Sequence, residues 1–291
     1  MSEELAYLNL IKELLTNGDC RQTRNGKVYS LFGKTIEFDI RKKFPLITTK
    51  KVFFRGIIEE LLFFLAGHTN SKILENKNIN IWKPNTTKEF IESRNLPYME
   101  GDMGPMYGFN WIHFGAKYVD CNFNYTDEGF NQLNQVLHLL KNDPSSRRII
   151  MTSYNPSVAE EGVLYPCHGI VIQFYVRTQE DINYVSCSMT QRSADIACGV
   201  PYNIASYAAL VYIICNYLGK NYKPDRLIIN LGDVHLYEEH IQEAKIQIER
   251  EPKDFPKLSI KEFGNIEELT FEHFILDDYN YHEPLKFIMK P

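Results

Sequence analysis

Residues 184–218 read YVSCSMTQRSADIACGVPYNIASYAALVYIICNYL, and this stretch decides the fold class. Residues 184–190 have the apolar and β-branched character of a strand, and Ile204–Leu218 is a long apolar run that ends before Gly219. A second strand is predicted soon afterwards, at Leu227–Leu231. A buried strand followed by a helix this apolar predicts an α/β domain, in which helices pack on a sheet.

Further helices are predicted from the spacing of apolar side chains, at 6–15, 52–66, 130–140 and 236–249. Further strands are predicted at 28–40 with a break at Gly33-Lys34, at 148–151, at 170–176 and in the tail from Leu258. Helices and strands do not alternate regularly as in a doubly wound fold, and no repeat or linker divides the chain. We therefore expect one domain across residues 1–291.

The composition excludes several classes of protein. The chain has 291 residues, 44% of them hydrophobic, and a net charge of -5. This balance argues against general nucleic-acid binding, although it leaves room for a local basic pocket. No apolar run approaches the roughly 20 residues of a membrane span, and the acidic N-terminus does not resemble a secretory signal. The six cysteines form no Cys-x-x-Cys pair, so we expect a reduced, cytoplasmic protein without membrane association.

One cysteine lies in a setting that suits chemistry. Cys167 follows Pro166 and precedes His168, just before the predicted strand at 170–176. Proline fixes the approach of the backbone, and a thiol near an arginine can have a lowered pKa and act as a nucleophile. Arg192 ends the next predicted strand. The alternative is a small core residue, since free cysteine is among the most buried residue types.

Other polar residues stand out against apolar neighbours. Glu59 and Glu60 interrupt an apolar helix and point about 100° apart. One of them can face solvent while the other is buried, with a raised pKa that suits proton transfer. The pair Arg147-Arg148 suits bidentate phosphate recognition, and 191–193 ends a strand, where α/β proteins often place ligand contacts. A salt-bridged carboxylate pair and a solvated arginine pair are the alternatives.

Metal and phosphate-loop signatures are missing. Residues 232–237 are interpreted as the opening of a helix that offers several hydrogen-bonding groups. His235 and His240 are five residues apart, not the four that place two ligands on one helical face. The sequence therefore predicts no metal site. A thiol, several arginines and a carboxylate together favour an anionic, planar substrate over a protein partner.

Eight motifs, in this order, closely resemble those of the thymidylate synthase family, and the match runs from about Tyr7 to Pro291. They are FPLITTKK (44–51), EELLFFLAGHTN (59–70), GDMGPMYGFNW (101–111), RRIIM (147–151), PCH (166–168), QRSAD (191–195), GVPYNIASY (199–207) and GDVHLY (232–237). So many matches in one order are not expected by chance.

The resemblance implies a single α/β (α+β) domain around a mixed β-sheet, forming a two-fold homodimer through its sheet faces. It implies the reductive methylation of dUMP to dTMP. 5,10-Methylenetetrahydrofolate gives both the carbon and the hydride in this reaction and leaves as dihydrofolate. dUMP and reduced folate are therefore the implied partners, and no metal is implied.

The resemblance also implies catalytic roles. Cys167 is the implied nucleophile at carbon 6 of the pyrimidine, and its addition makes carbon 5 enolate-like. Glu60 is implied to organise water and proton transfer, and Asn203 to pair with the carbonyl and ring N–H of the base. The implied catalytic set also contains Tyr107, His168 and Arg192, whose charge helps to stabilise the thiolate.

The resemblance implies two sets of binding residues. The nucleotide set is Arg24, Arg147, Arg148, Gln191, Arg192, Ser193, Asp195, Asn203, His235 and Tyr237. Four of these are phosphate-binding arginines, and Arg147 and Arg148 are implied to reach the phosphate from the other subunit. His235 and Tyr237 are implied to hold the sugar hydroxyl. The folate set is Ile81, Trp82, Asn85, Asp195, Gly199 and Tyr202, with the C-terminal residues closing over the folate.

The sequence departs from the family pattern in four places. Tyr165 replaces the first proline of Pro-Pro-Cys-His, and Lys83 replaces an aspartate. The loop that contains Arg24 is one residue shorter than usual, so Arg21 competes for its role. The chain ends in Lys290-Pro291 rather than in a small apolar pair, which restricts a closing tail.

Two alternatives to the implied activity remain. One is a pyrimidine hydroxymethylase on the same fold, which would add water instead of hydride. Asn203 argues against a cytosine substrate, and Trp82 argues for hydride transfer because an aromatic shield excludes water. The other is a catalytically silent, RNA-binding or scaffolding relative, which the acidic pI and the complete set of reactive groups disfavour.

Overall fold

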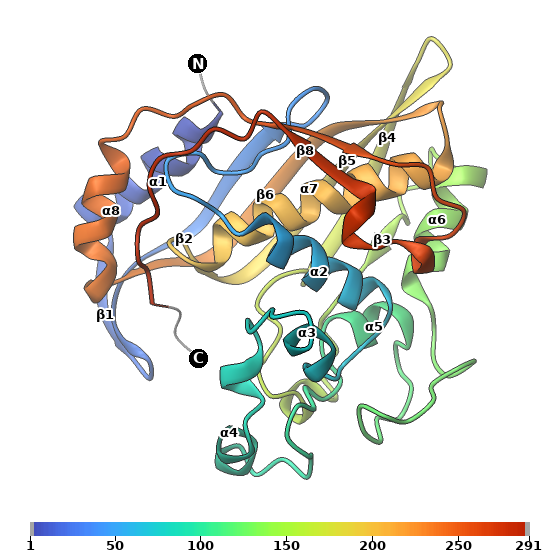
Figure 1. The fold of residues 1–291 in the computed structure, drawn as a ribbon, viewed down its shortest axis with the longest axis horizontal. Helices are drawn as coiled ribbons and strands as arrows, with labels where there is room; N and C mark the ends of the chain where they lie inside the picture. Colours follow the sequence, from blue (N-terminus) through green and yellow to red (C-terminus); the bar gives the residue numbers. More distant parts are fainter. Residues whose placement is uncertain (1–2, 289–291) are drawn as a thin grey trace.

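The computed structural model describes residues 3–288, which form a six-stranded sheet covered by helices (Figure 1). The strands of this sheet are β1 (Asp19–Thr23), β2 (Gly26–Asp39), β3 (Ile150–Met151), β4 (Val171–Gln179), β5 (Ile182–Asp195) and β6 (Tyr222–Tyr237). The helices are α1 (Glu4–Asn17), α2 (Phe54–Leu65), α3 (Lys72–Glu75), α4 (Lys88–Ser93), α5 (Gly108–Ile112), α6 (Gln132–Asn142), α7 (Gly199–Leu218) and α8 (Ile241–Ile248). A separate hairpin consists of β7 (Lys257–Ile260) and β8 (Phe274–Asp277).

Helix α7 lies at the centre of the hydrophobic core because its sequence is apolar on nearly every side. Buried residues follow one another along it, from Val200 to Cys215. It packs against β5 and β6 on one side and against α2 on the other. Figure 1 shows α7 lying across the sheet with α2 in front of it. Within residues 3–288, no helix has both the length and the apolar character needed to cross a membrane.

The sheet has the strand order β1-β2-β6-β5-β4-β3, and its one parallel pair is β5 and β6. Parallel neighbours need a long crossover connection, which α7 provides. Ser193 pairs with Asp233, and Asp195 with His235. Polar residues from two distant parts of the sequence therefore meet at the carboxyl ends of these two strands.

The predicted mixed α/β architecture is confirmed, and most predicted elements are present. The helices expected at 6–15, 52–66 and 130–140 are α1, α2 and α6, and the strand-like tail forms the β7–β8 hairpin. The strand β1 was not predicted, and the strand expected at 148–151 is only β3.

The prediction that residues 232–237 open a helix is wrong. Strand β6 runs through all of them, and α8 begins only after a short 3₁₀ turn. Val234 and Leu236 are buried and alternate with Asp233 and His235, which is the period of a strand. Pairing with β2 on one side and β5 on the other overrides the turn preference of glycine and aspartate.

Two smaller expectations also need correction. The break predicted at Gly33-Lys34 does not divide the strand, because β2 and β6 keep one register from Phe32–Asp233 to Lys34–Leu231. Gly33 has a φ of 75°, so glycine suits this point of the strand. Helix α7 begins at Gly199, so Asn203 lies inside the helix and not before it.

The sheet leaves apolar side chains exposed at its β3–β4 edge. Ile150, Val171 and Tyr175 are 47%, 37% and 63% exposed. Val171 and Tyr175 are four residues apart on β4 and therefore share one face. Exposed apolar groups gathered on one face are typical of an interaction surface.

The contact between α5 and α2 leaves no room for a side chain at Gly108. A Cβ atom there would lie 2.4 Å from the carbonyl oxygen of Phe64 and 2.6 Å from its Cα. We expect Gly108→Ala to lower the free energy of unfolding by about 1–3 kcal/mol in urea titrations, because the helices must separate. Gly199→Ala is the control, since a Cβ there meets nothing nearer than 4.0 Å. Equal losses in both variants would contradict this account.

Candidate active site

Cys167 lies on the loop that leads into β4, and hydrogen bonds tie this loop to two other parts of the chain. The N–H of Arg192 donates to the carbonyl oxygen of Cys167 at 2.7 Å. The N–H of Cys167 donates to the hydroxyl of Tyr107 at 3.0 Å. The same hydroxyl lies 3.2 Å from Cys167 Sγ. The backbone around the thiol is therefore fixed from both sides.

Cys167 is half-buried as a residue, and the pKa of its thiol is raised above the usual value. Loss of water around Sγ is the main cause, whereas the Tyr107 hydroxyl and the Arg192 charge act in the opposite direction. The predicted lowering of this pKa is therefore wrong, although Arg192 does favour the thiolate. The structure holds a thiol beside two groups that stabilise its ionised form.

Tyr107 is held in a strained backbone conformation, with φ 36° and ψ -98°. A non-glycine residue in such a sparsely populated region costs of the order of 1–3 kcal/mol. Its ring stacks on Phe64 at 5.0 Å and on His168 at 4.4 Å between ring centroids. This packing maintains the strained conformation and keeps the hydroxyl at Cys167.

His168 lies buried against Tyr107. Burial lowers the pKa of His168 to about 3, so its imidazole is neutral at physiological pH. Its Nδ1 is 2.9 Å from the hydroxyl of Tyr207. Tyr207 was not predicted at this site, and the signal available in the sequence was a tyrosine inside the apolar run of α7.

Glu60 and Glu59 on α2 are both buried, so the prediction that one faces solvent is wrong. They differ in their partners: Trp82 Nε1 donates to Glu60 at 2.7 Å, whereas Lys77 forms an ion pair with Glu59 at 2.6 Å. Burial raises the pKa of Glu60 to about 7. Its charge also acts on the Cys167 thiol. A carboxyl group with this pKa can both donate and accept a proton at physiological pH.

Gln191 and Asn203 form a buried amide pair between β5 and α7. Asn203 Nδ2 donates to Gln191 Oε1 at 3.0 Å, and Gln191 Nε2 donates to the carbonyl of Ser193 at 3.1 Å. This pairing fixes the orientation of the Asn203 amide. Such a fixed amide can read a ring that presents a donor beside an acceptor.

His235 and Tyr237 lie at the end of β6, next to the end of β5. Their rings meet edge to face at 5.4 Å, and His235 Nδ1 is 3.4 Å from a carboxylate oxygen of Asp233. Arg21 also binds Asp233, at 2.5 Å. Arg24, in the turn between β1 and β2, has no ion-pair partner among residues 3–288. Burial raises the pKa of the Tyr237 hydroxyl, and the charge of Arg24 is one of the smaller influences that oppose this rise. Arg24 is therefore better placed than Arg21 to bind a ligand.

The residues predicted for folate fall into two groups. Ile81, Trp82 and Asn85 lie at the 3₁₀ turn after α3, with Trp82 on Glu60. Gly199 and Tyr202 are in the first turns of α7. Burial, with a smaller contribution from the charge of Glu60, raises the pKa of Tyr202 to about 12. The two groups therefore approach each other across Glu60.

Asp195 is the last residue of β5 and lies just before the start of α7. One carboxylate oxygen accepts the backbone N–H groups of Ala197 at 2.9 Å and Cys198 at 3.0 Å. The carboxylate thereby holds the turn at residues 196–198, which leads into α7. It also interacts with the side chain of Cys198.

Arg147 and Arg148 are not brought to Cys167 by this chain alone. Both are exposed in the loop between α6 and β3. Within the described residues neither guanidinium bonds to a residue of the site around Cys167. Their predicted role stays a prediction that requires a second subunit.

Two of the residues that depart from the family pattern, Tyr165 and Lys83, contact nearby side chains. The hydroxyl of Tyr165, which is 37% exposed, donates to Glu160 at 2.8 Å. Lys83 is exposed and lies 4.0 Å from a carboxylate oxygen of Glu75. Lys290-Pro291 lies outside the described residues.

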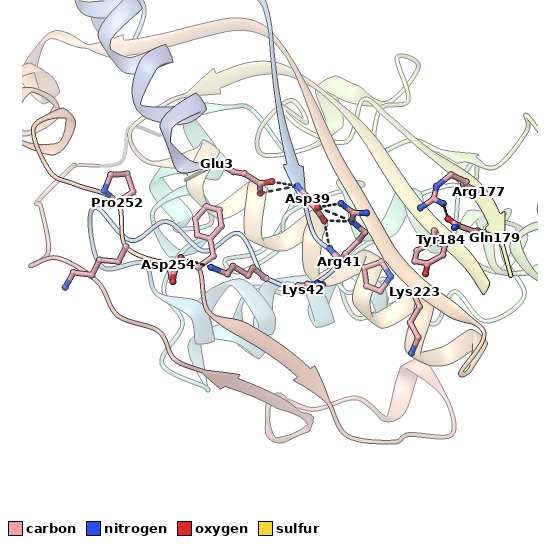
Figure 2. Close-up of a pocket in the computed structure, with 14 residues that line it drawn as sticks. Glu3, Asp39, Arg41, Lys42, Arg177, Gln179, Tyr184, Lys223, Pro252 and Asp254 are labelled. Atoms are coloured by element: carbon pink, nitrogen blue, oxygen red, sulfur yellow. Dashed lines mark hydrogen bonds and ion pairs between the residues drawn. The ribbon is translucent and has the colours of Figure 1, made fainter. Parts of the chain in front are cut away.

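A pocket of about 970 Å³ is lined by residues that include Asp39 of β2, Arg177 of β4 and Tyr184 of β5 (Figure 2). Figure 2 shows Arg41 bonded to Asp39, and Arg177 bonded to Gln179. Lys42 and Lys223 also line the pocket. None of the predicted site residues contributes to its lining, so pocket size does not identify the reactive centre here.

The arrangement around Cys167 defines a class of enzyme. A thiol held beside groups that stabilise the thiolate, with a carboxyl group of near-neutral pKa within electrostatic reach, is typical of cysteine-nucleophile enzymes that also use acid–base catalysis. The fixed amide pair adds a means of selecting the substrate.

Comparisons with known proteins identify the family. Residues 5–290 match the sequence model of thymidylate synthase. The chain is 44% identical to the thymidylate synthase of Agaricus bisporus over 290 residues, 97% of each chain. It is 43% identical to that of Human herpesvirus 8 over 290 residues, 99% of this chain and 84% of the relative. It also matches the bifunctional dihydrofolate reductase-thymidylate synthase of Paramecium tetraurelia, at 43% identity, but spans only 61% of that protein.

The chain therefore belongs to the thymidylate synthase family. It is a methyltransferase, and the reaction of this family converts dUMP to dTMP with methylenetetrahydrofolate as cosubstrate.

Glu60 makes stability depend on pH. Burial raises its pKa from 4.5 unfolded to about 7 folded, so its contribution is fully present below pH 4.5 and is lost as pH rises through 7. We expect Glu60→Gln to remove this loss and to gain about 3 kcal/mol over the wild type between pH 4 and pH 8 in urea unfolding. Glu59→Gln is the control, because it breaks the ion pair with Lys77. Parallel pH profiles of wild type and Glu60→Gln would contradict the prediction.

Proposed function

We propose that this chain acts as a thymidylate synthase in which Cys167 attacks carbon 6 of dUMP. The carbon–sulfur bond forms as the pyrimidine double bond moves its electrons toward carbon 5, which becomes enolate-like and able to accept a one-carbon unit. The observation that carries the proposal is the position of Cys167 Sγ, 3.2 Å from the Tyr107 hydroxyl and under the influence of the Arg192 charge.

The residues on the far side of Glu60 fit a folate. When bound, methylenetetrahydrofolate supplies the carbon and the hydride. Asn85 is 6% exposed, and its amide nitrogen has no hydrogen-bond partner among residues 3–288, so it can donate to a ligand. The residues that would hold the folate are Ile81, Trp82, Asn85, Asp195, Gly199 and Tyr202.

Glu60 is the proposed proton carrier. Its pKa of about 7 lets it release and take up protons at physiological pH. Trp82 fixes the carboxyl group through its indole N–H at 2.7 Å. The indole is also a shield that keeps water away from the reacting carbon, which favours hydride transfer over hydration.

Asn203 is the proposed reader of the pyrimidine. Uracil presents a ring N–H beside a carbonyl, and an amide can accept from one and donate to the other. Gln191 holds the amide of Asn203 in one orientation at 3.0 Å. A cytosine ring presents no N–H at that position and would be discriminated against.

The phosphate and the sugar are proposed to bind at the carboxyl ends of β5 and β6. Arg192 and Ser193 at the end of β5, with Arg24 from the β1–β2 turn, would hold the phosphate. Arginine suits a dianion because its planar group binds two oxygens at once. His235 and Tyr237 would hold the sugar hydroxyl.

A homodimer is proposed to complete the site. The exposed side chains of Ile150, Val171 and Tyr175 supply an apolar surface on the sheet. Arg147 and Arg148 lie on the loop that leads into β3, at the edge of this surface. They would therefore reach the phosphate of the partner subunit. We further propose a cytoplasmic enzyme that needs neither a metal nor a nucleic acid for this reaction.

Purified protein with dUMP and methylenetetrahydrofolate is expected to accumulate dihydrofolate, measured by absorbance. Cys167→Ser should abolish turnover yet keep dUMP binding measurable by calorimetry, because only the nucleophile is lost. Cys20→Ser is the control, as Cys20 is exposed on β1. Full activity of Cys167→Ser would overturn the assignment. Consumption of dUMP without dihydrofolate would indicate the hydroxymethylase instead.

The shared site predicts complementation between two inactive variants. A mixture of Cys167→Ser and Arg147→Ala subunits should recover about a quarter of wild-type activity, because two-fold pairing leaves one intact site in half of the dimers. Each variant assayed alone is the control. If mixed dimers isolated with two affinity tags show no activity, Arg147 does not act across the interface.

A further inference from the structure

Three potential metal ligands from separate parts of the chain meet near the start of α7. A carboxylate oxygen of Asp195, the thiol of Cys198 and a ring nitrogen of His240 all lie within 4.8 Å of one another. Asp195 ends β5, Cys198 precedes α7 and His240 precedes α8. Tertiary folding therefore assembles this cluster, and the spacing of His235 and His240 in the sequence could not reveal it.

The imidazole of His240 has a free lone pair. The side chain is 1% exposed, and Nε2 lies 2.9 Å from the carbonyl oxygen of Ile288. A carbonyl only accepts hydrogen bonds, so Nε2 carries the proton in the neutral ring and Nδ1 does not. Among residues 3–288, Nδ1 has no hydrogen-bond partner. A buried acceptor without a partner costs about 1–3 kcal/mol, and a coordinated ion would remove this penalty.

Charges around the cluster can balance a divalent cation. Both carboxylate oxygens of buried Glu4 accept hydrogen bonds, from the N–H and hydroxyl groups of Thr48 and Thr49, as an ionised carboxylate does. The ammonium group of Lys50 donates to the carbonyl of Ala197. Negative charges from Glu4, Asp195, Glu239 and a Cys198 thiolate would surround Lys50 and a divalent ion, with Glu239 Oε1 3.9 Å from His240 Nε2. Opposite charges placed close together lower the cost of burying an ion.

The donor set also points to the kind of metal. Thiolate, imidazole and carboxylate are the ligands that zinc takes, at about 2.0–2.3 Å, and a tetrahedral site places them about 3.3–3.8 Å apart. The three ligand atoms lie within 4.8 Å of one another, so small side-chain rotations can bring them to this spacing. Mg²⁺ and Ca²⁺ prefer sites made only of oxygen atoms.

We propose that Asp195, Cys198 and His240 bind a divalent transition-metal ion of the zinc type, with water as a fourth ligand. Binding replaces the thiol proton of Cys198, which passes to solvent. The ion bonds to Asp195 Oδ2 or displaces the N–H groups held by Oδ1.

The same site gives the ion a means of inhibiting the enzyme. This consequence, unlike the binding itself, rests on the proposed role of Asp195 in holding the folate. Coordination occupies a lone pair of the carboxylate and offsets its negative charge, so Asp195 becomes a weaker hydrogen-bond acceptor for another ligand. His240 also contacts the C-terminal segment, through Ile288 and through the ring of Phe287 at 5.3 Å. The bound ion therefore acts against folate binding.

Direct binding is tested with Co²⁺, whose bond to a thiolate gives a strong absorption band. The titration uses full-length Cys167→Ser, so that the nucleophile cannot contribute. One Co²⁺ per chain with a thiolate band is expected. The band should disappear when Cys198→Ala is added and persist when Cys215→Ala is added, since Cys215 is buried on the same helix outside the cluster.

A second variant guards against loss of folding. Adding His240→Gln to the Cys167→Ser protein should weaken Co²⁺ binding at least about tenfold, because it removes a direct ligand. Circular dichroism identifies any variant that fails to fold. Absence of stoichiometric Co²⁺ binding, or a thiolate band that survives both Cys198→Ala and His240→Gln, would overturn the proposal.

The inhibitory role is tested separately on active enzyme. Zn²⁺ should raise the apparent KM for methylenetetrahydrofolate, and Cys198→Ala should need at least about tenfold more Zn²⁺ for the same effect. Equal inhibition of Cys198→Ala and wild type would show that the ion acts elsewhere and would overturn this role. A wild type that never turns over would count against the proposed function, whereas the Co²⁺ result would still decide the metal site.

Discussion

The hydrogen bond from the N–H of Arg192 to the carbonyl of Cys167 links the nucleophile to the end of β5, and the rest of the site depends on this link. Strand β5 also carries Gln191, Ser193 and Asp195, so one strand sets the spacing between the thiol and the residues proposed to bind the phosphate and the folate. Its parallel pairing with β6 brings His235 alongside. The long buried helix α7 makes this parallel pairing possible because it connects the two strands. The site therefore depends on the apolar sequence that buries α7.

Exclusion of water acts on three reactive groups at once. It raises the pKa of Cys167 and Glu60 and lowers that of His168. All three are thereby shifted toward their neutral forms, as burial predicts. A neutral thiol and a neutral carboxyl group are stable together, whereas two anions would repel each other. Ionisation of Cys167 then depends on positive charge from Arg192 and from any further arginines of the phosphate site.

The sequence allowed the mixed α/β fold to be predicted, since apolar periodicity leaves local patterns. It also singled out Cys167 and Glu60, which the structure places within electrostatic reach of each other. Prediction from the sequence failed where contacts between distant parts of the chain determine the local structure. Residues 232–237 resemble a turn and a helix start, but two neighbouring strands hold them in β6. The pKa of Cys167 depends on a balance of burial and charge that no motif contains. The proposed role of Arg147 requires a second subunit.

Near the start of α7, the carboxylate of Asp195 has two roles: it bonds to the backbone, and it is a proposed metal ligand. Asp195 accepts the backbone N–H groups of Ala197 and Cys198, so it holds the turn that leads into α7. It also lies within reach of Cys198 and His240, which have the lone pairs of a metal site. Removing Asp195 would affect the turn before α7, the proposed folate contact and the proposed metal ligand together. Only substitution of Cys198 or His240, which lie outside the catalytic set, separates these effects.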